Sequence, residues 1–437
     1  MAGGTGVARV ELFHFSAPLP ATFRPSWIPG FPQNENRATL LRVLTEDGVE
    51  GWSAGPAIGR ERRGLGDLLG PYLVGEDATD IAMVQQRLRE MSYLGWRNWW
   101  IEPAFWDIKG KLEGEPVWRM LGGEPRDGGT VDVYASTGEV RSPEYRVREI
   151  EQRHAEGFGA IKIRVHEDEA ADEAQVRAAG EACRERGMLL GVDANQAWRV
   201  AAIADAPLWD LERAKRFADV CAEVGVAWIE EPLPMDDWEA QAALTEYSSV
   251  QIAGGELHTG AYPELAMMVE RRCYDVFQPD AIFTGGIDQT ARLARLCRKH
   301  GLTYTPHTWT NGVGFAVNLQ LYAAFGGAKP LEFPYDPPGW LPEGRDAMLA
   351  EPFTHERGRL RVPDGPGLGF EISKQALRRF AKRFFVMDRK RLAVFALRDR
   401  GLNAAREMNE TKSARLAAER AAATPSGDRA QEPSRPC

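Results

Sequence analysis

Three acidic residues stand at the ends of three successive strand-like runs in this chain. Asp193 lies in LLGVDAN, Glu230 in VAWIEEP and Glu256 in VQIAGGE. They are about 25 to 40 residues apart, the length of one strand plus one helix in a repeating β/α unit. Acidic residues at strand ends also serve as helix caps, but three at this spacing favour a shared site at the C-terminal mouth of a parallel barrel. A site of oxygen ligands alone suits a hard divalent cation, for which Mg²⁺ is the best candidate.

Basic residues follow the second strand of the same region. In AIKIRVH, period-two alternation places Lys162, Arg164 and His166 on one face. If that face points into the barrel, the metal site lies opposite a row of cations and bases. The alternative is a structural role as buried salt-bridge partners, because a cation on an apolar strand is costly unless it is paired.

Three further candidates end the last strands. FQPDAIFTGGI on the sixth strand contains Asp280, YTPHTW on the seventh contains His307, and KPLEFP on the eighth contains Glu332. On adjacent strands, Asp280 could hydrogen-bond His307, fix its tautomer and raise its basicity. We therefore expect an acid/base pair there, with the Glu332 carboxylate facing the same mouth.

The elements that must position these residues form two domains. Residues 8–60 alternate β-like runs around the hairpin turn Glu46-Asp47-Gly48, and residues 63–122 change to helical periodicity, which predicts an α+β capping domain. Residues 131–334 alternate strand and helix runs, with eight strand-like runs, which predicts a modified (β/α)₈ TIM-type barrel. The helix after the seventh strand is hard to place. A doubly wound open sheet is the rival fold, but YASTGEV after the first strand is not its Gly-rich turn.

The remaining segments follow the barrel. RLRVPDGPGLGFE is turn-rich and is expected to return the chain to the first domain, and residues 374–400 hold ten Lys or Arg against two Asp. We interpret the latter as a solvated basic helix packed by an apolar stripe, with an anionic partner as the alternative. The predicted units are a capping domain at 1–128, a barrel at 129–345, a return segment at 346–372, a basic helical extension at 373–422 and a disordered tail at 423–437.

Composition excludes several classes of protein. A net charge of −9 gives no bulk electrostatic drive toward nucleic acid or an anionic membrane. Five scattered cysteines lack the spacing of a zinc site and indicate free thiols in a reducing compartment. The N-terminus lacks the pattern of a signal peptide, and no run approaches a membrane span. We expect a cytoplasmic protein.

The motifs taken together resemble those of a known family. GFGAIKIR, VDANQAW, WIEEP, GGE, QPDAIFTGGI, TPHT and LEFP, with AFWDIKGKLEGEPVWRMLGG before them and VPDGPGLGFE after them, resemble the enolase superfamily, specifically its mandelate-racemase-like group. The resemblance runs over roughly residues 8–372 and depends on the combination of motifs. It implies a Lys or His base working with Mg²⁺ to stabilise an ene-diolate.

The resemblance also implies roles for individual residues. One Mg²⁺ per active site would be held by Asp193, Glu230 and Glu256, with Glu230 preferred to Glu231 because the first acidic residue of WIEEP is the usual ligand. His307 with Asp280 would form the acid/base dyad, and Glu332 would hydrogen-bond the substrate carboxylate. The first domain would close over the mouth, so that substrate choice depends on Trp27, Asn195 and His258.

One departure from the family pattern shapes the functional prediction. Where the group commonly has Lys-x-Lys, this chain has Lys162-Ile163-Arg164, and an arginine is a poor general base. A racemase needs an acid/base on each face of its substrate, whereas one dyad can remove an α-proton and assist loss of a β-hydroxyl. The sequence therefore predicts a Mg²⁺-dependent acid sugar dehydratase, with Lys162 and Arg164 as electrostatic partners. The alternatives are a racemase or epimerase and an inactive metal-binding scaffold. We expect a small-molecule carboxylate substrate and a homo-oligomer.

Overall fold

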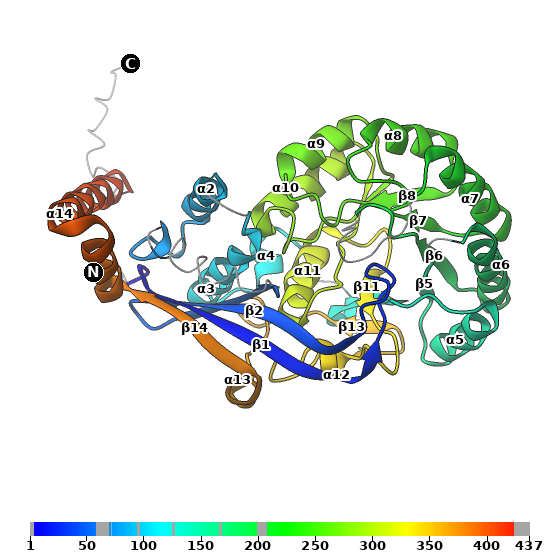
Figure 1. Cartoon of the computed structure of the whole chain (residues 1–437), viewed down its shortest axis with the longest axis horizontal. Helices are drawn as coiled ribbons and strands as arrows, with labels where there is room; N and C mark the ends of the chain where they lie inside the picture. Colours follow the sequence, from blue (N-terminus) through cyan, green and yellow to red (C-terminus); the bar gives the residue numbers. More distant parts are fainter. Residues whose placement is uncertain are drawn as a thin grey trace, which may run out of the picture.

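The capping domain is built on an antiparallel sheet at one end of the molecule (Figure 1). The structure is a computed structural model that describes residues 4–57, 70, 72–93, 97–124, 127–165, 168–198 and 208–423. The strands β1 (Val7–Phe23), β2 (Gln33–Thr45) and β3 (Glu50–Pro56) lie side by side, and the late strand β14 (Ala381–Asp388) pairs with the free edge of β1. The predicted hairpin turn joins β2 to β3, with Gly48 at φ +83°, a conformation that glycine adopts without steric cost.

Short helices cover one face of this sheet. They are α2 (Ile81–Ser92), η1 (Trp99–Ile101), α3 (Pro103–Glu113) and α4 (Val117–Met120). Helix α3 begins with a proline at its first position and ends at Gly114 in the left-handed conformation, which are the favoured residues at those positions. Aromatic side chains fill the interface, and a side chain at Gly55 of β3 would collide with the ring of Trp100.

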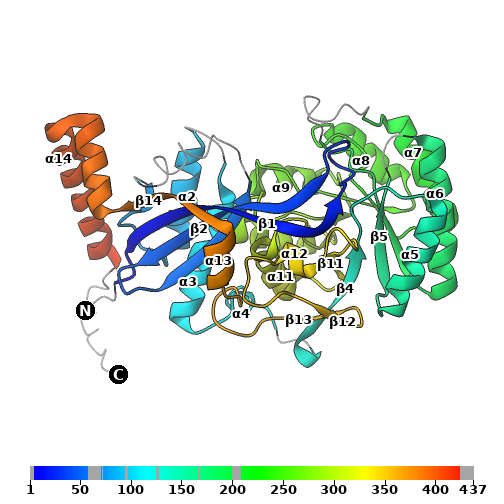
Figure 2. The same ribbon diagram turned by 60° about the horizontal axis from the view of Figure 1, so that its bottom comes forward.

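The second domain is a ring of parallel strands, each followed by a helix (Figures 1 and 2). In the described part of the chain, the strands from β4 to β10 pair in order, and β11 pairs with β4 on its other side, which confirms the predicted (β/α)₈-type fold. Between β10 and β11, Thr308 Oγ1 donates to the backbone oxygen of Glu332 at 3.0 Å. The strands are β4 (Thr130–Ser136), β5 (Ala160–Arg164), β6 (Leu189–Asp193), β7 (Trp228–Glu230), β8 (Gln251–Gly254), β9 (Val276–Phe277), β10 (Thr303–Tyr304) and β11 (Leu331–Pro334). The outer helices are α5 (Pro143–Ala155), α6 (Glu169–Arg186), α7 (Leu211–Val224), α8 (Trp238–Tyr247), α9 (Tyr262–Glu270) and α10 (Gly286–Lys299).

The helix that sequence could not place is α11 (Gly312–Phe325), which follows the seventh barrel strand. It contacts α10 on the barrel side and β3 and α4 on the cap side, so nearly every residue in it is buried. A helix that is apolar all round has no 3.6-residue periodicity to detect. Its N-terminus is marked by Asn311, whose side chain accepts from the backbone of Val313 and Gly314.

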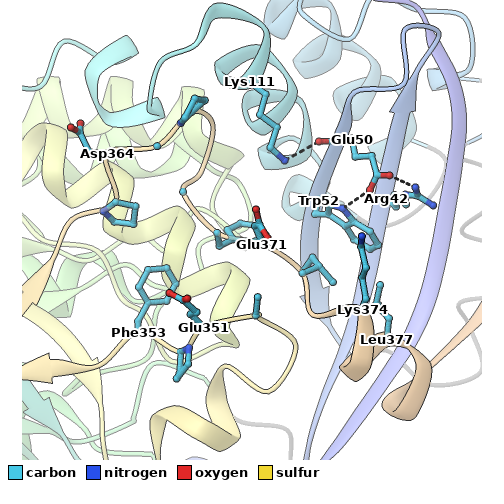
Figure 3. A pocket seen from close by; sticks show the side chains of 18 of the residues that line it. Arg42, Glu50, Trp52, Lys111, Glu351, Phe353, Asp364, Glu371, Lys374 and Leu377 are labelled. Atoms are coloured by element: carbon cyan, nitrogen blue, oxygen red, sulfur yellow. Dashed lines mark hydrogen bonds and ion pairs between the residues drawn. The ribbon is translucent and has the colours of Figure 1, made fainter.

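The chain returns from the barrel to the capping domain through a turn-rich segment. Helix α12 (Pro342–Arg345) is followed by a hairpin of β12 (His355–Glu356) and β13 (Arg359–Arg361), and β13 pairs with β4 in the antiparallel direction. The backbone of Gly367 then exchanges hydrogen bonds of 3.0 Å with Glu115 and Val117 next to α4. A groove of about 1240 Å³ remains between this segment and the cap sheet (Figure 3), and within it Arg42 and Lys111 are bonded to Glu50.

The C-terminal extension differs from the predicted helix over 373–422. It begins with α13 (Lys374–Phe380) and ends with α14 (Arg389–Ala423), which is broken at Gly401, but the prediction is wrong for residues 381–388, which form β14. The free edge of β1 decides this, because backbone pairing and burial of Met387 outweigh local helical periodicity. Helix α14 is tied to the cap by Lys412, which donates to the Val74 oxygen at 2.6 Å.

Two predictions fall on residues that the structure does not describe. His166 and residues 424–437, most of the predicted tail, lie outside the described ranges. Within those ranges, no helix is both long and apolar enough to cross a membrane.

Candidate active site

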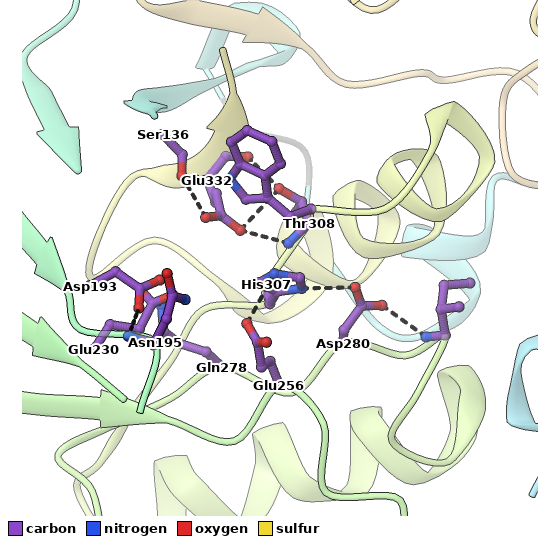
Figure 4. Close-up of polar contacts among 12 residues, drawn as sticks. Ser136, Asp193, Asn195, Glu230, Glu256, Gln278, Asp280, His307, Thr308 and Glu332 are labelled. Carbon is purple, nitrogen blue, oxygen red and sulfur yellow. Dashed lines mark hydrogen bonds and ion pairs between the residues drawn. The ribbon is translucent and has the colours of Figure 1, made fainter. Parts of the chain in front are cut away.

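The three predicted metal ligands end three adjacent barrel strands. Asp193 ends β6 and is the register partner of Glu230, which ends β7, while Glu256 follows β8. All three side chains are buried, and Figure 4 shows them around one mouth with the residues of the later strands. The structure therefore places the three residues at the same end of adjacent strands, as their spacing indicated, and their role as metal ligands stays a prediction.

Each of these carboxylates is paired with at least one basic side chain. Lys162 Nζ lies 2.5 Å from Oε1 of Glu230, Arg164 bonds Asp193, and Nε2 of His307 lies 3.0 Å from Oε2 of Glu256. Because Lys162 and Arg164 alternate along β5 with buried isoleucines, the barrel interior receives both side chains. Lys162 and Arg164 thus share one face, as period-two alternation predicted, and this face points toward the acidic cluster; His166, the third residue of the predicted row, lies outside the described residues.

Charge balance keeps Lys162 and Glu332 ionised. Burial disfavours the charged form of Lys162, but the charges of Glu230 and Glu332 outweigh burial and raise its pKa. Glu332 lies 2.7 Å from Lys162 Nζ, and in spite of its burial the cations Lys162, His307 and Arg164 lower its pKa to about 2. Glu332 also accepts from the backbone N–H of Thr308 at 2.7 Å and from the hydroxyl of Ser136 at 2.8 Å. The site therefore presents a fixed anion beside a fixed cation.

The donor set has the chemistry of a Mg²⁺ site, although its present arrangement is that of ion pairs. Over the described ranges, no group of three or more His, Cys, Asp or Glu side chains is gathered closely enough to hold a metal ion. However, burial and the charges of Glu256, Asp193 and Glu230 raise the pKa of Glu231 well above its usual range, and its buried Oε2 has no hydrogen-bond partner. Buried carboxylates that repel one another and include an unpartnered oxygen fit a hard cation.

The predicted contact between His307 and Asp280 is formed. His307 Nδ1 lies 3.0 Å from Asp280 Oδ2, and both side chains are buried. Burial opposes the imidazolium, but Glu256, Glu332 and Asp280 outweigh it and raise the pKa of His307 well above its usual range. Asp280 fixes Nδ1 as a donor, so Nε2, which faces Glu256, is the nitrogen available for proton transfer.

The cap reaches the site through the loop after β1. The Arg164 guanidinium carbon lies 5.2 Å from the ring centroid of Trp27 and 5.5 Å from that of Trp309, and these two rings contact each other edge-on at a centroid distance of 5.1 Å, so a cap residue and a barrel residue both lie beside it. The hydroxyl of Ser26 donates to Oδ1 of Asn195 at 2.6 Å, and the backbone N–H of Asn195 donates to Asp193 at 2.8 Å. Trp27 and Asn195 thus lie at the cluster, where substrate contact was predicted.

One predicted substrate contact, His258, has partners that are not members of the cluster. His258 is bound through Nδ1 to Glu264 at 2.9 Å, and its ring packs edge-on against Tyr274. Its role toward a substrate stays a prediction. Sequence reasoning missed several polar partners of the cluster because each is a common residue type without a spacing signal: Gln278, which donates to Glu230 at 2.8 Å, Ser136, Thr308, and Asn318, which donates to Asp280 at 2.7 Å.

Comparison with known families covers both domains. Residues 15–122 match the mandelate racemase / muconate lactonizing enzyme N-terminal domain, and residues 146–376 match the enolase C-terminal domain-like family. The second match alone spans more than half of the chain. It contains every predicted metal ligand and both members of the dyad.

Individual relatives align over most of the chain. D-galactarolactone cycloisomerase of Agrobacterium fabrum is 31% identical over 358 residues, which cover 78% of this chain and 90% of the relative. L-talarate/galactarate dehydratase of Salmonella typhimurium is 30% identical over 79% of this chain and 83% of the relative. The crystal structure of an enolase superfamily member from Polaromonas sp. JS666 superposes with a TM-score of 0.73 at 25% identity, over 86% of this chain and 97% of that chain.

Proposed function

Because the chain belongs to the mandelate-racemase-like group of the enolase superfamily, we propose that it is a Mg²⁺-dependent lyase that dehydrates a sugar acid. Asp193, Glu230 and Glu256 would hold the ion. When bound, Mg²⁺ supplies positive charge that stabilises the enolate formed next to the substrate carboxylate. The product would be a 2-keto-3-deoxy acid.

The observation that carries the proposal is the state of Arg164. Burial opposes its charge, but Asp193, Glu230 and Glu332 outweigh burial and raise its pKa further. Its Nε donates to the Thr137 oxygen at 2.7 Å, and its guanidinium carbon lies 5.2 and 5.5 Å from the ring centroids of Trp27 and Trp309. Arg164 is therefore a fixed cation and a poor proton acceptor, which leaves His307 as the acid/base.

The proposed reaction uses His307 twice. In the ion-paired cluster Glu256 raises the pKa of His307, so the base form of His307 requires that the bound cation neutralise the charge of Glu256. Neutral Nε2 would then remove the α-proton, and the electron pair would form the enolate, which Lys162 and Arg164 stabilise as cations. The enolate then expels the β-hydroxyl, which takes the proton from the His307 imidazolium and leaves as water. The resulting enol becomes the 2-keto acid. Asp280 holds Nδ1 throughout, so the same nitrogen of His307 handles both protons.

A cycloisomerase of a sugar acid lactone is the second candidate. It is favoured by the relative named D-galactarolactone cycloisomerase, which is 31% identical. Its β-leaving group would be a carboxylate, which departs without being protonated, so the single dyad would suffice. A racemase or epimerase would instead require Lys162 or Arg164 to accept a proton, and both are held as cations.

Product analysis separates these reactions. The full-length protein with Mg²⁺ is incubated with galactarate, with its lactone, and with a panel of aldonates and aldarates, and products are followed by ¹H NMR and by a keto-acid assay. Dehydration gives a 2-keto acid from a free sugar acid. Ring opening without net loss of water identifies the cycloisomerase, and a product that differs only in configuration identifies an epimerase. If the protein converts none of these compounds, the dehydratase proposal is overturned.

A further inference from the structure

Helix α11 carries two completely buried amide side chains, Asn318 and Gln320, among otherwise mostly apolar residues. A buried amide is costly unless its hydrogen bonds are made, so each should have a definite task. Two positions apart on a helix, they face different directions. Gln320 faces the cap and the return segment. Its Oε1 accepts from the backbone N–H of Trp118 at 2.7 Å, and its Nε2 donates to the backbone oxygen of Leu368 at 3.1 Å.

Asn318 faces the dyad instead. Its Nδ2 donates to Oδ1 of Asp280 at 2.7 Å, and its Oδ1 accepts from the backbone N–H of Ala281 at 3.1 Å. The orientation of this amide is fixed because a backbone N–H can only donate and must face the oxygen. The backbone N–H of Ile282 also donates to Oδ1 of Asp280, at 2.9 Å.

The two oxygens of Asp280 therefore have separate partners. Oδ1 receives Asn318 and Ile282, whereas Oδ2 receives Nδ1 of His307 at 3.0 Å. The terminal torsion of an aspartate has a broad energy profile, so the carboxylate plane is set by its hydrogen bonds. A donor that holds Oδ1 from α11 fixes the direction in which Oδ2 points.

We propose that Asn318 is a positioning residue of the acid/base pair, which orients Asp280 and through it the Nδ1–H of His307. Asn318 does not touch the substrate mouth; it acts through Asp280. Outer partners of this kind typically change activity by about 10- to 100-fold when removed, because the group they orient loses its geometry. The kinetic part of this inference rests on the proposed function.

The test uses matched pairs of variants in the full-length protein. Asn318→Asp keeps the size of the side chain and its acceptor but replaces the Nδ2 donor, and Asn318→Leu removes both groups. Gln320→Glu and Gln320→Leu make the same changes at the buried amide that faces away from the dyad. The first readout needs no turnover: with ¹⁵N-histidine labelling, the Nδ1–H resonance of His307 is assigned by its loss in His307→Asn.

The expected result is that Asn318→Asp shifts or abolishes the His307 Nδ1–H resonance, whereas Gln320→Glu leaves it in place even where both variants lose similar thermal stability. With a substrate that the wild type converts, Asn318→Asp should lower kcat about tenfold or more at unchanged KM, and Gln320→Glu should not. If the wild type converts no sugar acid, the dehydratase proposal fails while the NMR result still decides the role of Asn318. An unchanged His307 resonance in Asn318→Asp and Asn318→Leu, or the same shift in Gln320→Glu, would overturn the inference.

Discussion

Lys162 Nζ lies 2.5 Å from Oε1 of Glu230, so the lysine on the second barrel strand neutralises the carboxylate predicted to bind metal on the fourth. The same ammonium group lies 2.7 Å from Glu332 and 3.4 Å from Asp193. A buried lysine with three carboxylates is stable only as a cation, and the carboxylates are stable only with positive charge beside them. The charge of the cluster therefore underlies the predictions on metal binding and on catalysis that follow.

Removal of metal should abolish activity. Mutual repulsion among Asp193, Glu230 and Glu256 favours a bound cation, so turnover should be lost in excess EDTA after dialysis and restored by Mg²⁺. Glu230→Gln should weaken Mg²⁺ binding measured by calorimetry by at least about tenfold. Glu371→Gln, an exposed residue of the groove in Figure 3, is the control. Full turnover in EDTA would contradict the assignment.

His307 and Asp280 should contribute unequally to turnover. His307→Asn should abolish turnover because it removes the acid/base, and Asp280→Asn should lower kcat by a factor of about 10² or more because the imidazole loses its orienting acceptor. Steady-state kinetics and circular dichroism of both variants separate chemistry from misfolding. If a folded His307→Asn protein keeps most of the wild-type rate, His307 is not the base, and Lys162 becomes the leading candidate for that role.

Proton exchange should occur on one face of the substrate only. Because Arg164 holds its proton, an accepted sugar acid should exchange its α-hydrogen in D₂O, while the epimer at that carbon should neither exchange nor react. Arg164→Lys introduces an amine whose pKa can fall by several units when it is buried near another cation such as Lys162. This variant is expected to gain exchange of the other epimer and to lose dehydration. Deuterium incorporation by NMR measures both, and two-face exchange in the wild type would favour an epimerase.

Lys329 should destabilise the fold at neutral pH. Burial lowers the pKa of Lys329 to about 8, whereas in the unfolded chain lysine titrates near about 10.4. The penalty of the buried charge is complete below pH 8 and disappears as pH rises to about 10.4, because over that interval only the unfolded chain keeps the proton. Lys329→Met should therefore raise the free energy of unfolding at pH 7 and lose this advantage by pH 10.4. Denaturant titrations at both pH values check this, with the exposed Lys299→Met as control.

The extension after residue 373 should divide into a dispensable and an essential part. Deleting residues 424–437 should leave kinetics and melting temperature unchanged, since TPSGDRAQEPSRPC has no apolar periodicity with which to pack. Truncation after Phe380 removes β14 and exposes the edge of β1, together with the surface that buries Met387. That protein should melt at a lower temperature and aggregate more readily. Equal melting temperatures for the two truncations would show that β14 adds nothing to the cap sheet.

Sequence alone determined the strand ends that carry Asp193, Glu230, Glu256, Asp280 and His307. The reason is that a side chain at the C-terminal end of a parallel strand has little choice of direction, and β/α spacing repeats along the chain. The alternation in AIKIR likewise put Lys162 and Arg164 on one face of the strand, whereas the structure decided that this face points into the barrel. These are local patterns, and a single amino-acid sequence is enough to reveal them.

Only the tertiary structure decided which partner each group has. Asn318 and Gln320 are both amides on a helix without periodicity, and three-dimensional packing alone sends one to Asp280 and the other to the cap. The pairing of β14 with β1 joins segments from opposite ends of the chain, which no local pattern encodes. Long-range contacts of this kind depend on the complete fold, because backbone edges and buried polar groups take the partners that the fold brings within reach.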